Sequence, residues 1–99
     1  MNIMLVCSAG MSTSMLVTKM EAAASSQGID AKIWAIPEAQ LQADIDKCDV
    51  ILLGPQVRFL KSKIEAVAAP KNIPVEVIDM MNYGAMNGEA VLKQALNMK

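Results

Sequence analysis

Residues 3–16 read IMLVCSAGMSTSML: a short apolar run, then a cysteine, then a cluster of small and hydroxyl-bearing residues. The run at 3–6 has the composition of a buried β-strand. From Ser12 onward the apolar residues recur at helical spacing, which predicts a helix over 12–27 that ends at Gly28. A strand that passes through a tight loop into a helix is the opening unit of a parallel sheet.

The rest of the chain repeats this alternation of strand and helix. Further apolar runs that predict strands cover 31–36, 50–53 and 75–78. The predicted helices that follow begin at Pro37, Pro55 and Glu89. Residues 79–88 have the composition of a loop with one helical turn. We therefore predict an α/β fold with a four-stranded parallel sheet in the flavodoxin-like order 2-1-3-4 and helices on both faces.

The composition limits the kinds of protein this can be. With 99 residues, 54% of them apolar, the chain has material for one domain over 1–99. A formal net charge of -1 provides no cationic surface for nucleic acid. The first residues, MNIMLVCSAG, lack a basic start and an apolar run long enough for a signal peptide or a membrane span. We expect a cytoplasmic protein that inserts into no membrane and binds no nucleic acid.

The chain has two cysteines and no histidine. It therefore cannot supply a Cys-His dyad or the commonest metal ligand, and we expect neither a metal nor a cofactor. Cys48 lies between acidic residues in DKCDV, where like charge raises the pKa of a thiol, so we interpret it as structural. Cys7 and Cys48 fall at opposite edges of the predicted sheet, too far apart for a disulfide. We interpret the nine methionines as core filling.

The loop after the first strand has the features of a phosphate site. Backbone amides and the positive end of the helix dipole can hold an anion, and hydroxyl groups add further donors. The predicted phosphate-binding residues are Ser8, Ala9, Gly10, Met11, Ser12, Thr13 and Ser14. The same field stabilises a thiolate, so we predict that Cys7 is a nucleophile. Two alternatives are an inert buried cysteine and a non-catalytic anion-binding domain.

Three stretches resemble a known family: CSAGMSTSMLVTKM, DVILLGPQVRFL and PVEVIDMMNYG. The family is the enzyme IIB component of the bacterial phosphoenolpyruvate-dependent sugar phosphotransferase system, in its lactose, cellobiose and chitobiose group. The resemblance implies a transferase in which Cys7 accepts a phosphoryl group from a phosphohistidine of enzyme IIA. The phosphocysteine, surrounded by residues 8–14, would then pass the group to a β-diglycoside-type sugar bound in membrane enzyme IIC. The lack of histidine agrees with a donor imidazole on another protein.

The same loop also resembles that of low-molecular-weight tyrosine phosphatases, which share this type of fold. An enzyme like these phosphatases or like arsenate reductase is the main alternative. In the phosphatases an arginine follows the cysteine after five residues, and an Asp-Pro pair supplies the general acid. Here Thr13 stands at the arginine position, and Asp79 is followed by Met80. Without the guanidinium and the acid, water should attack a thiophosphate slowly, which suits a carrier.

Three residues beyond the loop are weaker candidates for contacts with the phosphate or a partner. Gln56, Asp79 and Tyr83 follow the third and fourth strands and should lie at the same edge of the sheet as Cys7. Aromatic residues are only 3% of the chain, so we expect the membrane component to select the sugar. We also expect a monomer that meets its partners transiently.

Overall fold

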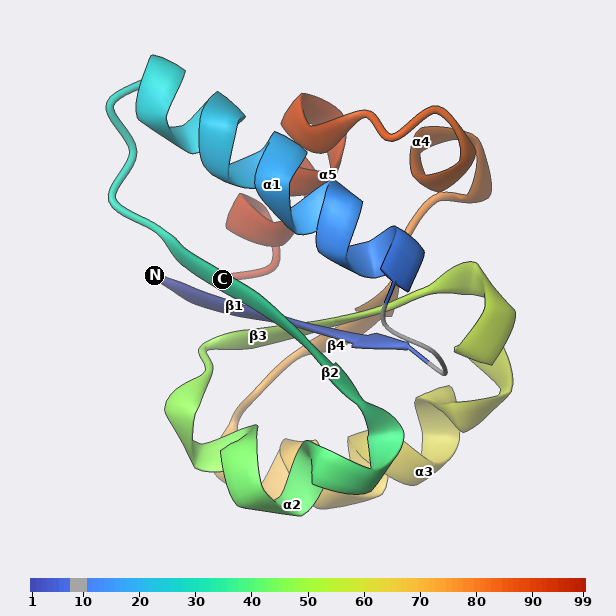
Figure 1. Cartoon of the computed structure of the whole chain (residues 1–99). Coiled ribbons are helices and arrows are strands. Elements are labelled where there is room, and N and C mark those ends of the chain that lie inside the picture. The colour runs from blue at the N-terminus through green and yellow to red at the C-terminus, as the bar shows by residue number, and fades with distance from the viewer. Residues whose placement is uncertain (8–10) are drawn as a thin grey trace.

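The computed structural model describes residues 1–7 and 11–99, without the side chains of Met11 and Ser12. Figure 1 shows one sheet with helices on both sides of it. The strands of this sheet are β1 (Asn2–Cys7), β2 (Lys32–Pro37), β3 (Val50–Leu53) and β4 (Val75–Val77). Neighbouring strands are parallel, and their spatial order is β2-β1-β3-β4. The predicted α/β class and the order 2-1-3-4 are confirmed.

Helices cover the two faces of the sheet (Figure 1). One face carries α1 (Met11–Ser26), α4 (Met80–Gly84) and α5 (Gly88–Leu96). The other face carries α2 (Leu41–Asp44) and α3 (Lys61–Ala68). Short 3-10 segments flank these last two helices: η1 (Glu38–Gln40), η2 (Ile45–Lys47), η3 (Pro55–Leu60) and η4 (Ala69–Lys71). In the part of the chain described here, no helix is long and apolar enough to cross a bilayer.

Both prolines that predicted helix starts lie close to such starts, with one correction. Pro37 is still the last residue of β2, where it pairs with Cys7, and η1 begins one residue later. Pro55 begins η3, but α-helical geometry starts only at Lys61, because Val57 (φ -119°, ψ 23°) interrupts the turn. Proline fixes φ near the helical value, so it allows a first turn without deciding whether that turn is α or 3-10.

Two apolar clusters, one on each face of the sheet, hold the helices in place. Side chains alternate along a strand, so Ile3 and Leu5 pack on the side of α1 and α5. Met4 and Val6 pack on the side of α2 and α3. All four of these side chains are fully buried. Burial on both faces explains why the strands have continuous apolar sequences.

The connections leave the central strands toward opposite faces. The chain passes from β1 into α1 on one face, and from β3 into α3 on the other. Because β1 and β3 are neighbours, these two connections diverge at their carboxyl ends. In open parallel sheets such a point forms the crevice that receives ligands. Cys7 is the residue that ends β1 there.

Candidate functional site

Cys7 lies at the carboxyl edge of the sheet, and its side chain is fully buried. Its Sγ lies 3.9 Å from the carbonyl oxygen of Ile36 in β2, a long thiol hydrogen bond. Alternation along β1 puts Cys7 on the same side of the sheet as Leu5, which is the side of α1. A thiol in this position is shielded from bulk water.

The predicted phosphate loop is described only in part. Ser8, Ala9 and Gly10 lie outside the described residues. Met11 and Ser12 are the first residues of α1, and their side chains are also outside the description. Thr13 and Ser14 follow in the same first turn of α1. Phosphate binding by residues 8–14 therefore stays a prediction.

Thr13 is linked directly to Tyr83, and through Tyr83 to Gln56, from distant parts of the chain. Its side chain is fully buried, with 0% exposure, which is uncommon for a polar residue. The Thr13 Oγ1 lies 3.4 Å from the hydroxyl oxygen of Tyr83 in α4. Gln56 in η3 donates from Nε2 to the same Tyr83 hydroxyl at 3.1 Å. The structure thus brings Gln56 and Tyr83 to the first turn of α1, close along the chain to Cys7.

Gly54, between β3 and η3, makes room for this arrangement. Its N–H donates to the Val6 carbonyl at 3.0 Å, which ties the end of β3 to the end of β1. A Cβ on Gly54 would lie only 2.7 Å from Gln56 Oε1. The missing side chain therefore allows the Gln56 amide to fold back toward Tyr83. The sequence signal for this role, a glycine two residues before a glutamine, is too common to have revealed it.

Asp79, the third candidate outside the loop, has a structural role in the described part of the chain. It is the N-cap of α4, and its Oδ1 accepts from the N–H groups of Met81 and Asn82 at 3.0 and 3.1 Å. A capping carboxylate satisfies donors that a helix leaves free at its start. Asp79 thereby holds α4, and with it Tyr83, at the sheet edge. A direct contact of Asp79 with phosphate or a partner remains a prediction.

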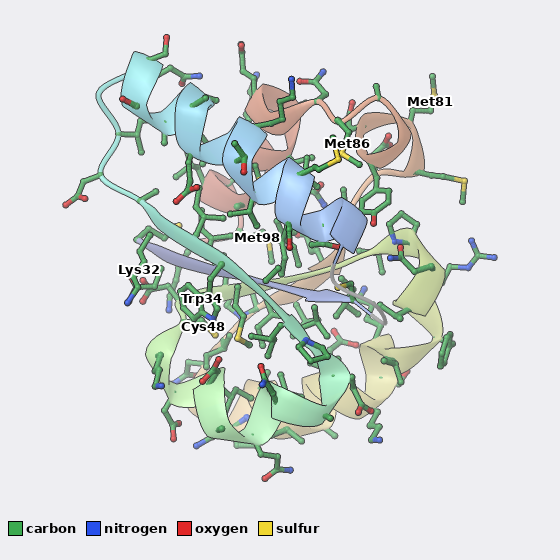
Figure 2. All side chains as sticks on the ribbon, viewed as in Figure 1. Lys32, Trp34, Cys48, Met81, Met86 and Met98 are labelled. Carbon is green, nitrogen blue, oxygen red and sulfur yellow. The ribbon has the colours of Figure 1, made fainter. Side chains whose placement is uncertain are left out.

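A groove of about 610 Å³ borders this cluster. It is lined by Pro55, Gln56, Arg58, Phe59, Met80, Tyr83 and Gly84. Two of the lining side chains are large, apolar and exposed, Phe59 at 76% and Met80 at 61%, and Met81, the next residue of α4, is 83% exposed. Figure 2 shows Met81 pointing away from α4 into solvent. We call Phe59, Met80 and Met81 the apolar rim, and such exposed apolar groups are typical of surfaces that contact other macromolecules.

The apolar rim corrects the interpretation of the methionines as core filling. Met4 and Met20 are fully buried as expected. Met15, Met80 and Met81 are exposed instead. Hydrophobicity alone could not separate the two groups, because the helical turn at 80–84 is too short to show an apolar stripe.

Cys48 differs from Cys7 in its surroundings. It is nearly buried on the α2 and α3 side of the sheet, and its Sγ donates to the Ile45 carbonyl at 3.3 Å. Burial, and then the negative charge of Asp49, raise the pKa of Cys48 to about 11. The predicted direction is confirmed, although burial is a larger cause than charge. Both cysteines are free thiols, and the described residues contain no cluster of acidic or cysteine ligands that could hold a metal.

The sequence matches one family model over nearly its whole length. The model is described as "PTS system, Lactose/Cellobiose specific IIB subunit" and matches residues 2–94. The oligo-beta-mannoside-specific EIIB component of Bacillus subtilis is 50% identical over 96 residues, covering 97% of this chain and 93% of that protein. The cellobiose-specific EIIB component of Lactococcus lactis subsp. lactis is 45% identical over 105 residues, with 97% and 94% covered.

Solved structures show the same similarity. The solution structure of a cellobiose-specific phosphotransferase IIB component from Borrelia burgdorferi has a TM-score of 0.82 and 53% sequence identity, covering 99% of this chain and 90% of that one. The lactose-specific IIB domain from Streptococcus pneumoniae has a TM-score of 0.90 at 16% identity, with 99% and 96% covered. At that low identity the second match supports the fold alone.

Proposed function

Because this chain belongs to the lactose/cellobiose-specific IIB family of the sugar phosphotransferase system, we propose that it carries the phosphoryl group on Cys7. As a IIB component the protein is a subunit of a sugar phosphotransferase. The finer proposal assigns the covalent step to one atom, the Sγ of Cys7. It also names a phosphohistidine of enzyme IIA as donor and a sugar bound in membrane enzyme IIC as acceptor.

The position of Cys7 carries this proposal. It ends β1 where the connections from β1 and β3 diverge, and it leads through residues 8–10 into the first turn of α1. The first amides of a sixteen-residue helix have no acceptor within the helix itself, and with the positive dipole end they suit an anion. For Cys48, burial and the charge of Asp49 raise the pKa, and the opposing effect of Lys99 is smaller than that of burial.

The two transfer steps balance without a further catalyst in this chain. The Cys7 thiolate attacks the phosphorus of phosphohistidine, the S–P bond forms, and the P–N bond breaks to release the imidazole of the donor. A sugar hydroxyl then attacks the same phosphorus, its proton passes to a base outside this chain, and the S–P bond breaks to restore the thiolate. Since the chain contains no histidine, the imidazole of the first step belongs to the donor protein. Positioning and electrostatics suffice for in-line phosphoryl transfer of this type.

The names of the relatives support a proposal for the class of sugar. Their names specify an oligo-beta-mannoside, galactose and cellobiose. We assign to this chain a β-linked disaccharide or short oligosaccharide, presented by enzyme IIC at the cytoplasmic side of the membrane. The protein itself would act in the cytoplasm as a monomer that binds each partner in turn.

Mapping of the phosphate tests the proposal. The protein is mixed with a phosphorylated enzyme IIA of the lactose/cellobiose group, and its peptides are analysed by mass spectrometry. We expect one S-phosphate, on Cys7, and none in the Cys7→Ser variant, whose nearly isosteric side chain preserves the melting temperature. The matched Cys48→Ser variant should still be labelled. Phosphate on Cys48, no phosphate at all, or steady hydrolysis of an aryl phosphate by the isolated protein would each contradict the proposal.

A further inference from the structure

The Tyr83 hydroxyl joins three segments that meet beside the proposed phosphate loop. It lies 3.4 Å from Thr13 Oγ1 and accepts from Gln56 Nε2 at 3.1 Å. We infer that Tyr83 is a positioning residue for phosphoryl transfer, which fixes the Thr13 hydroxyl in the orientation that the transferring group requires. The inference rests on the proposed role of Cys7 and adds Tyr83 as a residue that acts through Thr13.

The burial of Thr13 makes its hydroxyl a useful group to position. A fully buried hydroxyl needs a hydrogen-bond partner, because an unpaired one loses its interactions with water. The hydroxyl also lies in the first turn of α1, the turn that residues 8–10 enter from Cys7. A hydroxyl in that turn can add a donor to the backbone amides of the helix start. Tyr83 supplies a fixed neighbour for this hydroxyl from outside the loop.

The chemistry of the donors gives one of the two contacts a direction. The Gln56 amide nitrogen has only protons to give, so the Tyr83 oxygen is the acceptor in that contact. A phenol that accepts there can donate to Thr13, and Thr13 can then donate in turn. Negative charge spreads over the phosphoryl oxygens in the transition state, so a preorganised donor lowers the barrier more than a freely rotating one.

Gln56 and Gly54 hold Tyr83 from its other side. Because Gln56 is exposed, burial does not fix the orientation in which its amide folds back over the chain. Gly54 provides the space, since a Cβ there would meet the Gln56 side chain at 2.7 Å. Asp79 fixes the start of α4, four residues before Tyr83. The hydroxyl of Tyr83 is therefore supported by groups in η3 and α4.

A double-mutant cycle under single-turnover conditions tests the inference. Transfer from phosphorylated enzyme IIA is followed by rapid quench at several donor concentrations, and the maximal rate is separated from the half-saturating concentration. We expect Tyr83→Phe to lower the maximal rate about three- to tenfold, the effect of one lost hydrogen bond, with the half-saturating concentration unchanged. Thr13→Val should lower it about a hundredfold, and Thr13→Ser, which keeps the hydroxyl, should recover most of that loss.

The decisive comparison is Tyr83→Phe in the Thr13→Val background. If Tyr83 acts through Thr13, the Tyr83→Phe substitution does not lower the maximal rate any further in the Thr13→Val background. Gln56→Met should resemble Tyr83→Phe, whereas Gln94→Met should leave the rate unchanged. Gln94 makes hydrogen bonds of the same type to Glu76 Oε1 and the Val77 carbonyl, both at 3.0 Å, outside the site.

Other outcomes separate this inference from the proposed function. Wild-type protein that carries no phosphate on Cys7 overturns the proposed function. If the wild-type protein is phosphorylated on Cys7, two results would overturn the inference alone. Either Tyr83→Phe transfers as fast as the wild type, or it lowers the maximal rate by the same factor in the wild-type and Thr13→Val backgrounds. Melting temperatures identify a variant that fails to fold, in which case Gln56→Met, a substitution of an exposed residue, provides the test.

Discussion

At the residue scale, the two buried thiols of this chain lie in different surroundings. Cys48 lies within the apolar cluster under α2 and α3, next to the carboxylate of Asp49. Both neighbours disfavour a thiolate, since burial removes water and a negative charge repels another. Cys7 ends a strand at the edge where α1 begins. Position in the sheet, more than residue type, separates the structural cysteine from the proposed nucleophile.

The raised pKa of Cys48 predicts a loss of stability at alkaline pH. Its pKa is about 11 in the folded protein against the ordinary 9.0, so the unfolded chain releases this proton first as the pH rises. The contribution to stability is therefore complete below about pH 9 and is lost progressively up to about pH 11, with about 1.4 kcal/mol gone at about pH 10. Urea unfolding of wild type and Cys48→Ala at about pH 8 and pH 10 measures it. An equal pH dependence in the two proteins would contradict this prediction.

At the element scale, the close packing of α1 against α5 depends on a glycine that the sequence pattern did not single out. Gly88 is the first residue of α5 and is buried. A Cβ there would lie 2.6 Å from the carbonyl oxygen of Lys19 in α1. Backbone atoms cannot move aside as a flexible side chain can. The approach of the two helices is therefore set by the absence of a side chain at one position.

Replacement of Gly88 by alanine should destabilise the fold. The added methyl group must push α5 away from α1, and overpacking of this kind costs about 1–3 kcal/mol. Gly84→Ala is the matched control, because a Cβ at Gly84 would meet nothing within 4 Å. The control should be neutral or slightly stabilising, since alanine restricts the unfolded chain more than glycine does. Denaturant unfolding of both variants checks the pair, and equal stability would count against the packing argument.

The elements were largely predictable because their sequence signals are local. Apolar runs at 3–6 and 50–53 predicted β1 and β3, and Gly28, with a φ of 68°, follows the end of α1 as expected. The start of the third helix was predicted less well. Whether Pro55 begins an α-helix or a 3-10 turn depends on how η3 packs against the sheet, which no local pattern encodes.

The site was predictable only to the extent that it is continuous in sequence. Cys7 and the hydroxyls after it lie in one stretch, so the residue types suggested their chemistry directly. The link from Gln56 through Tyr83 to Thr13 spans three elements and arises from tertiary packing. Sheet topology predicted that Gln56 and Tyr83 would reach the same edge, but not that they would bond to each other. The role of Gly54 could be recognised only from the position of the Gln56 side chain in the folded structure.

At the scale of the whole molecule, the site and an apolar surface share one edge of the sheet. Tyr83 belongs to both, since it contacts Thr13 and also lines the groove beside the apolar rim. A phosphoryl carrier must bring its thiol within bonding distance of two different proteins in turn. A surface that contacts both partners and lies beside the thiol would serve this purpose without any large movement of the fold. The exposed side chains of Phe59 and Met80 at the groove make apolar contact one attraction that such a surface can offer.

Loss of the apolar rim should weaken binding of the donor while leaving the fold intact. Phe59 is 76% exposed and Met81 83%, so Phe59→Ala and Met81→Gln should change the free energy of unfolding by less than about 0.5 kcal/mol. Aromatic side chains at the centre of an interface often contribute most of its energy, and we expect Phe59→Ala to raise the half-saturating concentration of phosphorylated enzyme IIA about tenfold. The maximal transfer rate should stay the same, because neither residue contacts Thr13 in the described structure. Met81→Leu keeps the apolar area and should retain wild-type affinity. A fall in the maximal rate at unchanged affinity would show that the rim acts on the chemical step instead of on docking.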